Sequence, residues 1–461
     1  MYSDLHELRD LDNYHRGIQP DPYMPANASD EYHLLARRAV TNVMQLLVNA
    51  PAQSLAVDSY RRGSSADSTE WNHWRASDLA IRQDAIHRAA LIFGHSFTVT
   101  EQTSEGARTR GLSPMRTAAL YTDPASDLDP VCALTVTAWP TNTDGKGVPG
   151  HAILWTATHR YEVHFKGRGT DVRISRGFKH GSSACPVTRF AVNVDLEGRT
   201  TGVIGPFRRL QDRINQVIFD LLIAQSYASW AVRWATGMAP PMLTDPVYAD
   251  PDDPTSEIIG TKPRLDANGQ PIPAPINHNA SRFLFAPDPD SKFGSLPGTP
   301  LSGYIEAVGM AFRHLSALAQ LPPAYLVGEL VNVAAEALDA SEAGFLRMLG
   351  GLQTMLGAPW KRVFRLAAEL DGQAEAALAD DGEIVWRDIG SRSMAAIADA
   401  LGKLATQLGV PPRALWTRIP GITGEELDYF ERIAAEDSDG ALARAIDRVT
   451  GGDAFSPAEP S

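Results

Sequence analysis

Residues 206–236, PFRRLQDRINQVIFDLLIAQSYASWAVRWAT, carry the most regular pattern in this chain of 461 residues. Apolar side chains recur there at alternating intervals of three and four, which places them along one seam of a helix about 45 Å long. Pro206 stands where the first turn of a helix tolerates proline. An ordinary bundle helix would show the same spacing. We expect the seam to pack closely against neighbouring helices, and it contains Phe207, Leu210, Ile214, Val217, Leu221, Ala224, Ala228 and Ala231.

The composition changes directly after this helix. Residues 239–298 hold 12 of the 32 prolines in the chain. Proline at this density excludes long helices, so the segment reads as strands and loops inserted between helices. A flexible linker is the alternative, but the short apolar runs PPMLT and RFLFA favour strands that pair.

Helical spacing resumes at 301–320 and stops at the adjacent prolines Pro322 and Pro323. A longer helix is expected to open near Asn332, a good N-cap residue, and to keep one apolar face for about nine turns. Glycines and Pro359 inside it predict a bend near 357–359. The segment between the two helices therefore reads as a short loop.

The N-terminal half of the chain is predicted to mix helices and strands. Residues 32–50 and 71–93 have helical spacing. From there to about residue 203 the runs are short, rich in β-branched and aromatic residues, and separated by turn formers, as in antiparallel strands. After residue 371 three shorter helical segments follow, and the last residues read as a disordered tail. The fold class is α+β.

Composition excludes several classes of protein. No run of about 18 apolar residues occurs, and the N-terminus is polar and acidic, so we expect neither a membrane span nor a signal peptide. Cys132 and Cys185 show no metal-binding or redox spacing, which indicates free thiols. The net charge of -13 argues against broad nucleic-acid binding, because such affinity comes from Lys and Arg that displace phosphate counterions.

The search for catalytic motifs finds almost nothing. The stretch GKGVPG at 145–150 lacks the spacing of a phosphate-binding loop, and there is no HExxH. Histidines are densest at His151, His159, His164 and His180, where polar strand faces are a simpler interpretation than a metal site. We therefore expect no catalytic residue, metal or cofactor. The alternative is a soluble α+β hydrolase with a site in the β-rich region around His159 and His164.

Several stretches, taken in chain order, resemble the portal proteins of tailed bacteriophages. The resemblance covers about residues 30–435 and consists more of helical pattern than of invariant chemistry. The matching stretches are ALIFGHSFTVT at 90–100, GPFRRLQDRIN at 205–215, LPPAYLVGE at 321–329, AAEAL and SEAGFLRML within 334–349, and VWRDIGSRSMAAIADALGKLATQLGVPPRALW at 385–416.

The resemblance implies a portal-type fold: an α/β wing, a two-helix stem, a small α/β clip, a long kinked wing-crown helix and an all-α crown, assembled as a ring. Its boundaries would be an N-terminal arm at 1–29, the wing at 30–204, the first stem helix at 205–238, the clip at 239–298, the second stem helix at 299–320, a tunnel loop at 321–332, the wing-crown helix at 333–371, the crown at 372–440 and a C-terminal tail at 441–461.

The resemblance also implies a function. Portals of this kind form a dodecameric ring at one capsid vertex, through which double-stranded DNA is packaged and ejected without sequence specificity. The large terminase subunit docks on the clip and head-tail adaptor proteins later replace it, while the ring contacts the major capsid protein and in some cases a scaffold protein. The portal itself hydrolyses nothing, which agrees with the missing motifs. It would reside in the virion, and in the host cytoplasm during assembly.

Three groups of residues follow as site predictions. Gly328, Glu329 and Asn332 would line the narrowest part of the channel, where an acidic chain lets DNA slide because it does not hold phosphates. The seam residues Phe207, Leu210, Ile214, Val217 and Leu221 would pack the stem. The clip would contact its partners through Arg264, Arg282 and Asp290.

Overall fold

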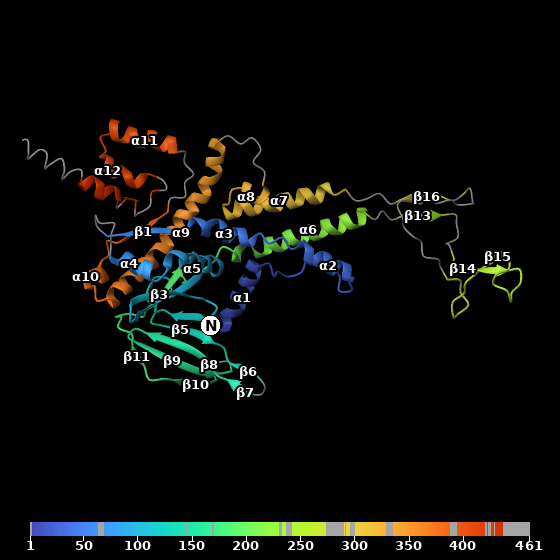
Figure 1. The fold of residues 1–461 in the computed structure, drawn as a ribbon, viewed down its shortest axis with the longest axis horizontal. Coiled ribbons are helices and arrows are strands. Elements are labelled where there is room, and N and C mark those ends of the chain that lie inside the picture. The colour runs from blue at the N-terminus through green and yellow to red at the C-terminus, as the bar shows by residue number, and fades with distance from the viewer. Residues whose placement is uncertain are drawn as a thin grey trace, which may run out of the picture. The chain divides into compact units, whose positions relative to one another are not determined.

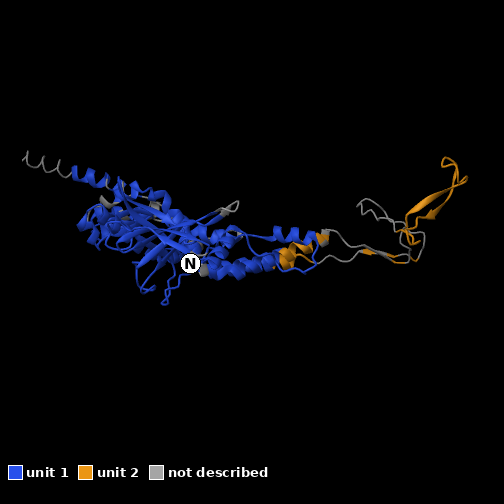
Figure 2. Ribbon diagram, turned by 90° about the horizontal axis from the view of Figure 1, so that it is seen from below, with its two compact units in different colours: residues 1–218, 307–461 blue, residues 219–306 orange. Residues whose placement is uncertain are grey.

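The fold is that of a computed structural model, and it consists of two compact units. Unit 1 comprises residues 1–218 and 307–461, and unit 2 comprises residues 219–306 (Figure 2). The structure describes residues 2–436 apart from 63–68, 144–145, 168–169, 230–232, 237–241, 273–289, 291, 296–299, 329–334, 388–393, 420–421, 423–425 and 428.

The long helix α9, Ala335–Leu370, is central to unit 1 (Figure 1). It contacts the helix α4 (Thr69–Ala76) and the strands β2 (His95–Thr103), β3 (Gly106–Leu112), β12 (Val187–Ala191) and β17 (Glu383–Trp386). Pro359 lies inside it, as expected, and the helix continues for eleven residues beyond that proline. The predicted apolar face is buried at Phe345, Leu349, Leu352, Leu356, Val363 and Leu366.

Two antiparallel sheets form the β-rich part of unit 1. The first has the strand order β12-β2-β3, and the second runs β10-β9-β8-β5-β4 with β11 also paired to β9. The apolar run AILWTATHRYEVHF at 152–165 spans parts of two strands, because the chain turns between β8 and β9. The strands are β2 His95–Thr103, β3 Gly106–Leu112, β4 Thr117–Leu120, β5 Cys132–Ala138, β8 Gly150–Thr156, β9 His159–Lys166, β10 Thr170–Ile174, β11 Phe178–Lys179 and β12 Val187–Ala191, with a small β6–β7 hairpin at Thr141–Thr143 and Lys146–Val148.

The helices of the N-terminal half pack on the same core as α9. Each predicted helix is split in two: 32–50 is broken at residues 40–43, and 71–93 is broken at Ser77 and Asp78, whose φ is 52°. The first helix of the chain was not predicted at all, although it buries Leu5, Leu8 and Leu11. The helices are α1 Tyr2–Arg16, α2 Asp30–Ala39, α3 Met44–Ser54, α4 Thr69–Ala76 and α5 Leu79–Phe93.

The C-terminal segment 372–440 is not all-α, so that prediction was wrong. Its strand β17, Glu383–Trp386, pairs antiparallel with β1, Val57–Arg61, more than 300 residues earlier. The strand forms because Ile384 is buried against the unit 1 core, which local spacing does not reveal. The other elements are helical: α10 Ala374–Leu378, α11 Met394–Gln407, α12 Pro412–Leu415 and the short 3-10 helix Trp416–Arg418.

Unit 2 contains the end of one long helix, two strand pairs and the start of another helix. The helix α6, Arg208–Ser229, follows a short 3-10 turn at Gly205–Phe207 and enters the unit, and α7, Ser302–Ala319, leaves it. The helix predicted over 206–236 is therefore too long, because residues 233–236 pair as a strand. The expected α/β character of 239–298 is not seen, since the described part of that segment holds strands only. The strands are β13 Arg233–Thr236 paired with β16 Lys292–Ser295, and β14 Thr244–Tyr248 paired with β15 Ile258–Pro263.

Proline explains the strands of unit 2. Pro246 lies in β14 and Pro263 lies in β15. Among the described residues these two strands form a two-stranded sheet, so each has an edge where a missing amide hydrogen breaks no strand pairing. Of the run PPMLT, Met242 and Leu243 precede β14 and Thr244 is its first residue, whereas Pro240, Pro241 and RFLFA fall outside the described residues. Among the described residues, a helix with the length and apolarity to span a bilayer is not found.

Candidate functional site

The predicted seam of α6 packs into the unit 1 core, to which α7 and α9 also contribute. Ile214 is fully buried, and Phe207 and Leu210 are half-buried against the same core that contains Ala311 and Leu315 of α7. Arg213 Nη2 lies 3.3 Å from His314 Nδ1, which adds a polar contact between the two helices. Two further seam residues are half-buried, Val217 in unit 1 and Leu221 in unit 2.

A second, polar face of α6 is as well buried as the seam. Gln211 and Asn215 have exposed fractions of 0% and 1%. Asn215 Oδ1 accepts a hydrogen bond from the Thr41 amide at 3.1 Å, and Gln211 Oε1 accepts one from the Val43 amide at 3.2 Å. Gln211 Nε2 donates to the Thr41 carbonyl at 2.8 Å. These bonds satisfy the backbone where the predicted helix 32–50 is broken.

The N-terminal helix is also bound to α6. Arg208 forms ion pairs with Glu7, at 2.8 Å, and with Asp10. The Tyr14 hydroxyl donates to Asp212 at 2.8 Å, and burial together with this carboxylate raises the pKa of Tyr14. Sequence reasoning missed this contact, although an i, i+3, i+6 repeat of leucine at 5, 8 and 11 was the available signal. The helix predicted as the first stem therefore has buried partners on two sides.

The segment after α7 is anchored where the proline pair begins. Gln320 adopts a left-handed φ of 55°, and Leu321 and Pro322 are buried. The Ser316 hydroxyl donates to the Leu321 carbonyl at 2.7 Å, and the Leu321 amide donates to the Ser316 carbonyl at 3.0 Å. The first residues of the predicted loop are therefore held in place, because the apolar Leu321 packs into the core.

The anchored stretch ends at Gly328. A one-turn helix, α8 at Ala324–Val327, places the Tyr325 ring 6.0 Å from the Phe345 ring of α9. Gly328 follows with a φ of 70° and is exposed, and a Cβ there would meet nothing within 4 Å, so only the backbone conformation favours glycine. The other two predicted channel residues, Glu329 and Asn332, lie outside the described residues.

Two of the three residues predicted to contact partners of the clip lie in the described part of the chain. Arg264 donates two hydrogen bonds to Asp245 Oδ1, at 2.8 and 2.5 Å, and these bonds lower the pKa of Asp245. Asp290 is an exposed turn residue, and Arg282 lies outside the described residues. Because Arg264 and Asp245 are paired across the two strands of one hairpin, Arg264 is positioned rather than free in solvent.

The alternative enzyme site is not assembled. His159 and His164 are five positions apart on β9, whose pairing with β8 is regular, so their side chains point to opposite faces of the sheet. His159 Nδ1 lies 2.8 Å from the hydroxyl of its neighbour Thr158, and its ring is 6.0 Å from that of Tyr161 on the same face. The two histidines cannot act on one substrate together.

Comparison with known families identifies the chain. A family model described as phage portal protein, SPP1 Gp6-like, matches residues 3–440. The chain belongs to this phage portal protein family. The portal protein of Mycobacterium phage D29 is 24% identical over 409 residues, covering 86% of this chain and 78% of its own length. The portal protein of Mycobacterium phage L5 is 24% identical over 384 residues, covering 80% and 73%.

Two of the solved structures that the chain matches come from gene transfer agent particles. The chain titled "Virion of native gene transfer agent (GTA) particle" is 13% identical with a TM-score of 0.42, covering 87% of this chain and 95% of that one. "Neck of native GTA particle computed with C12 symmetry" is 14% identical with a TM-score of 0.40, covering 85% and 92%. Membership of the portal family confirms the resemblance drawn from the sequence.

The family also confirms the class of function. Roles at the capsid vertex, in DNA packaging and ejection and in the head-tail connection follow from it, and the portal is a structural part of the virion. The hydrolase alternative around His159 and His164 is not supported, which agrees with the opposed orientation of the two side chains.

Proposed function

We propose that twelve copies of this chain form a ring whose axial channel carries double-stranded DNA into and out of the capsid. The observation that carries this proposal is the match to the portal family over residues 3–440, which includes every element predicted for the stem and the channel loop. The ring size and the channel-lining residues are the proposed part.

Side chains left uncovered by a single chain support the ring. Met310 and Leu318 of α7 are 48% and 68% exposed, and Leu346 of α9 is 42% exposed. Burying apolar area of this kind stabilises an assembly by about 25 cal/mol per Å² before the cost of association. In the proposed ring, α6 and α7 stand beside those of neighbouring copies, which cover these side chains.

The channel would be narrowest at the segment that follows Gly328. This segment is anchored on one side by Leu321 and α8, and α9 begins at Ala335 on the other side, so its reach is short. We assign Gly328, Glu329 and Asn332 to the channel surface. A carboxylate at residue 329 would repel phosphates and keep DNA from binding tightly while it moves.

The clip would receive the partners. The strand β15 is exposed along its whole length, and Ile258 and Ile259 are 58% and 67% exposed. Exposed apolar side chains on a paired hairpin suit a protein partner. We assign this surface, with Arg264, Arg282 and Asp290, to the large terminase subunit and then to a head-tail adaptor. The wing would face the major capsid protein and any scaffold, with assembly in the host cytoplasm and no cofactor or membrane involved.

Native mass spectrometry and negative-stain microscopy of the purified chain test the ring. We expect an annular oligomer, and we expect Leu318→Glu to shift it toward monomers because a charge would enter the interface. Leu378→Glu is the matched control, since Leu378 of α10 is 85% exposed and lies outside the stem. Packaging-competent particles whose portal vertex holds no ring of this chain would overturn the proposal.

A packaging assay tests the channel. Glu329→Lys should slow DNA translocation, whereas Glu197→Lys, on an exposed turn between β12 and α6, should leave it unchanged. Equal translocation rates for Glu329→Lys and wild type would remove residue 329 from the channel surface.

A further inference from the structure

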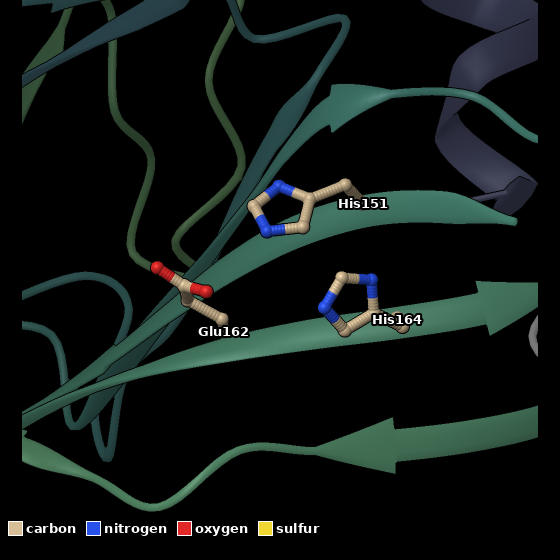
Figure 3. Close-up of side chains that lie close together, drawn as sticks. All are labelled: His151, Glu162 and His164. Carbon is tan, nitrogen blue, oxygen red and sulfur yellow. The ribbon is translucent and has the colours of Figure 1, made fainter.

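Three metal-ligating side chains converge on one face of the six-stranded sheet. His151 of β8 and His164 of β9 are directly opposite each other in the strand register, and Glu162 precedes His164 by two positions. The alternation of side chains therefore places all three on one face. One ligand atom of each lies within 4.8 Å of the others, and the two imidazole rings are 5.0 Å apart (Figure 3).

The cluster stands at the open end of a buried face. Ile153 and Trp155 share this face of β8 and are buried, while His151 and Glu162 are half-buried and His164 is exposed. The backbone of Glu162 is held on its other edge: its amide donates to the Ser175 hydroxyl at 2.9 Å, and its carbonyl accepts from the Ser175 amide at 2.9 Å. The ligand atoms are therefore accessible to an ion from solvent, but their strands are fixed.

A β-bulge orients the first histidine. The register of β5 against β8 shifts between Val136 and Ala138, and the extra residue, Thr137, turns its hydroxyl toward His151. That hydroxyl donates to the His151 carbonyl at 3.0 Å and lies 2.7 Å from His151 Nδ1. Because its single hydrogen is directed at the carbonyl, the oxygen accepts from Nδ1–H, which leaves the lone pair on Nε2 free to bind a metal.

We propose that His151, Glu162 and His164 form a binding site for a divalent transition metal of the zinc class. Two imidazoles and one carboxylate are a ligand set that zinc accepts, whereas calcium and magnesium prefer oxygen ligands alone. Three protein ligands leave one tetrahedral position for water. The sequence led us to expect no metal. His151 lies on a different strand from Glu162 and His164, and only the pairing of the two strands shows that the three side chains share a face.

Nearby cations compete with the metal only weakly. Arg160 Nη2 lies 3.8 Å from Glu162 Oε1, while its Nε lies 3.7 Å from Glu101 Oε1, so this guanidinium is shared between two carboxylates. Arg173, opposite His164 in the register, has an 81% exposed side chain, and its Nε lies 3.9 Å from Asp171 Oδ1. The Arg173 side chain can turn into solvent. The bound ion would then fasten β8 to β9 without any part in the movement of DNA.

Metal binding to the full chain tests the site. After chelator treatment, isothermal titration with Zn²⁺ should show one ion per chain, and Co²⁺ should give the visible absorption of a four-coordinate site. His164→Asn should weaken Zn²⁺ binding by at least about 100-fold, since it removes a ligand, and Thr137→Val by about tenfold.

His159→Asn is the matched control, because it removes a histidine from the same strand but from the opposite face. It should leave the Zn²⁺ affinity unchanged. His164 is exposed, so its variant should keep the wild-type circular dichroism and oligomeric state. The proposal fails if the chelated wild type binds no Zn²⁺, or if His164→Asn and His159→Asn bind it equally well.

Discussion

Unit 1 closes around large aromatic side chains, whereas unit 2 leaves most of its strand residues in solvent. In unit 1, Trp360 of α9 is fully buried, with ring centroids 4.9 Å from Trp74 and 4.6 Å from Phe190. In unit 2 every residue of β15 is exposed. The same backbone pairing therefore rests on a packed core in one unit and, among the described residues of the other, on hydrogen bonds supported by the ion pair Arg264–Asp245.

This difference fits a division of labour within a portal subunit. A core stabilises through apolar burial, and it must be complete in each copy. An exposed hairpin contributes little to the stability of the single chain, so its side chains are free to be used by a partner. Substitutions in the two units should consequently affect different measurements: the free energy of unfolding for unit 1, and binding for unit 2.

The largest expected effect is that of Trp360→Ala, about 4 kcal/mol of lost unfolding free energy. The change leaves a cavity and removes the hydrogen bond from Trp360 Nε1 to His87 Nε2, 2.9 Å long. Chemical denaturation measures it. Trp416→Ala, at a half-buried tryptophan near the C-terminal end of the described chain, is the control and should cost less than half as much. Equal costs would mean that α9 is not the centre of the unit 1 core.

Acid should destabilise unit 1 through its buried histidines. Burial lowers the pKa of His73, His87 and His95 to about 4. Since the folded-state pKa lies below the unfolded value of 6.5, the stabilisation is complete above pH 6.5 and is lost as the pH falls toward 4. For His87 alone this amounts to about 3 kcal/mol, at 1.4 kcal/mol per pH unit.

Unfolding titrations at several pH values check this dependence. His87→Gln retains a donor for the Leu55 carbonyl, which His87 Nδ1 contacts at 2.9 Å, but does not titrate. The slope of stability between pH 6.5 and 4 should therefore be shallower in the variant by about one proton. An unchanged slope would show that His87 is not held neutral by burial.

Arg362→Met should cost about 2 kcal/mol. Arg362 of α9 is 3% exposed and donates to the carbonyls of Cys185, at 2.7 Å, and Val187, at 3.0 Å. Methionine fills similar space but leaves these buried acceptors unsatisfied. Arg365→Met, one turn on, is the control: its partner Asp380 is 93% exposed, so the loss should be below about 1 kcal/mol. If both variants lose the same free energy, α9 is not joined to β12 through Arg362.

The smallest effect on stability should come from unit 2. Ile259→Ala, at a residue 67% exposed, should change the unfolding free energy by less than about 0.5 kcal/mol. The fully buried Ile214→Ala should cost at least about 2 kcal/mol. Pull-down with the terminase subunit should show the reverse order, with only Ile259→Ala weakening binding. A large loss of stability for Ile259→Ala would contradict the division between the units.

Helical periodicity predicted the helices whose apolar side chains form one uninterrupted buried face. The face of α9 from Phe345 to Leu366 and the seam of α6 around Ile214 could be read directly, because every third or fourth residue meets the same core. The buried Gln211 and Asn215 could not, since polar residues at helical spacing look like a solvent-facing surface until their partners at Thr41 and Val43 are known.

The sequence predicted only some features of the candidate sites. Gly328 was predicted as a channel residue from the resemblance, and its left-handed backbone agrees with a loop at this position. The anchoring of Leu321, by contrast, depends on Ser316 and the core of the folded chain. For the cluster on β8 and β9, the sequence indicated a dense histidine group but not which members share a face. His159 was grouped with His164 although the register pairs His151 with His164 instead.

The sequence alone determined the long helix α9, the seam of α6, the α+β class and the resemblance to phage portals, because these depend on local spacing repeated over long stretches. Tertiary structure alone decided the pairing of β1 with β17, the break at residues 40–43 and the convergence of His151, Glu162 and His164. These features join residues that are distant in the chain, and the free energy that selects them comes from groups that meet only after folding.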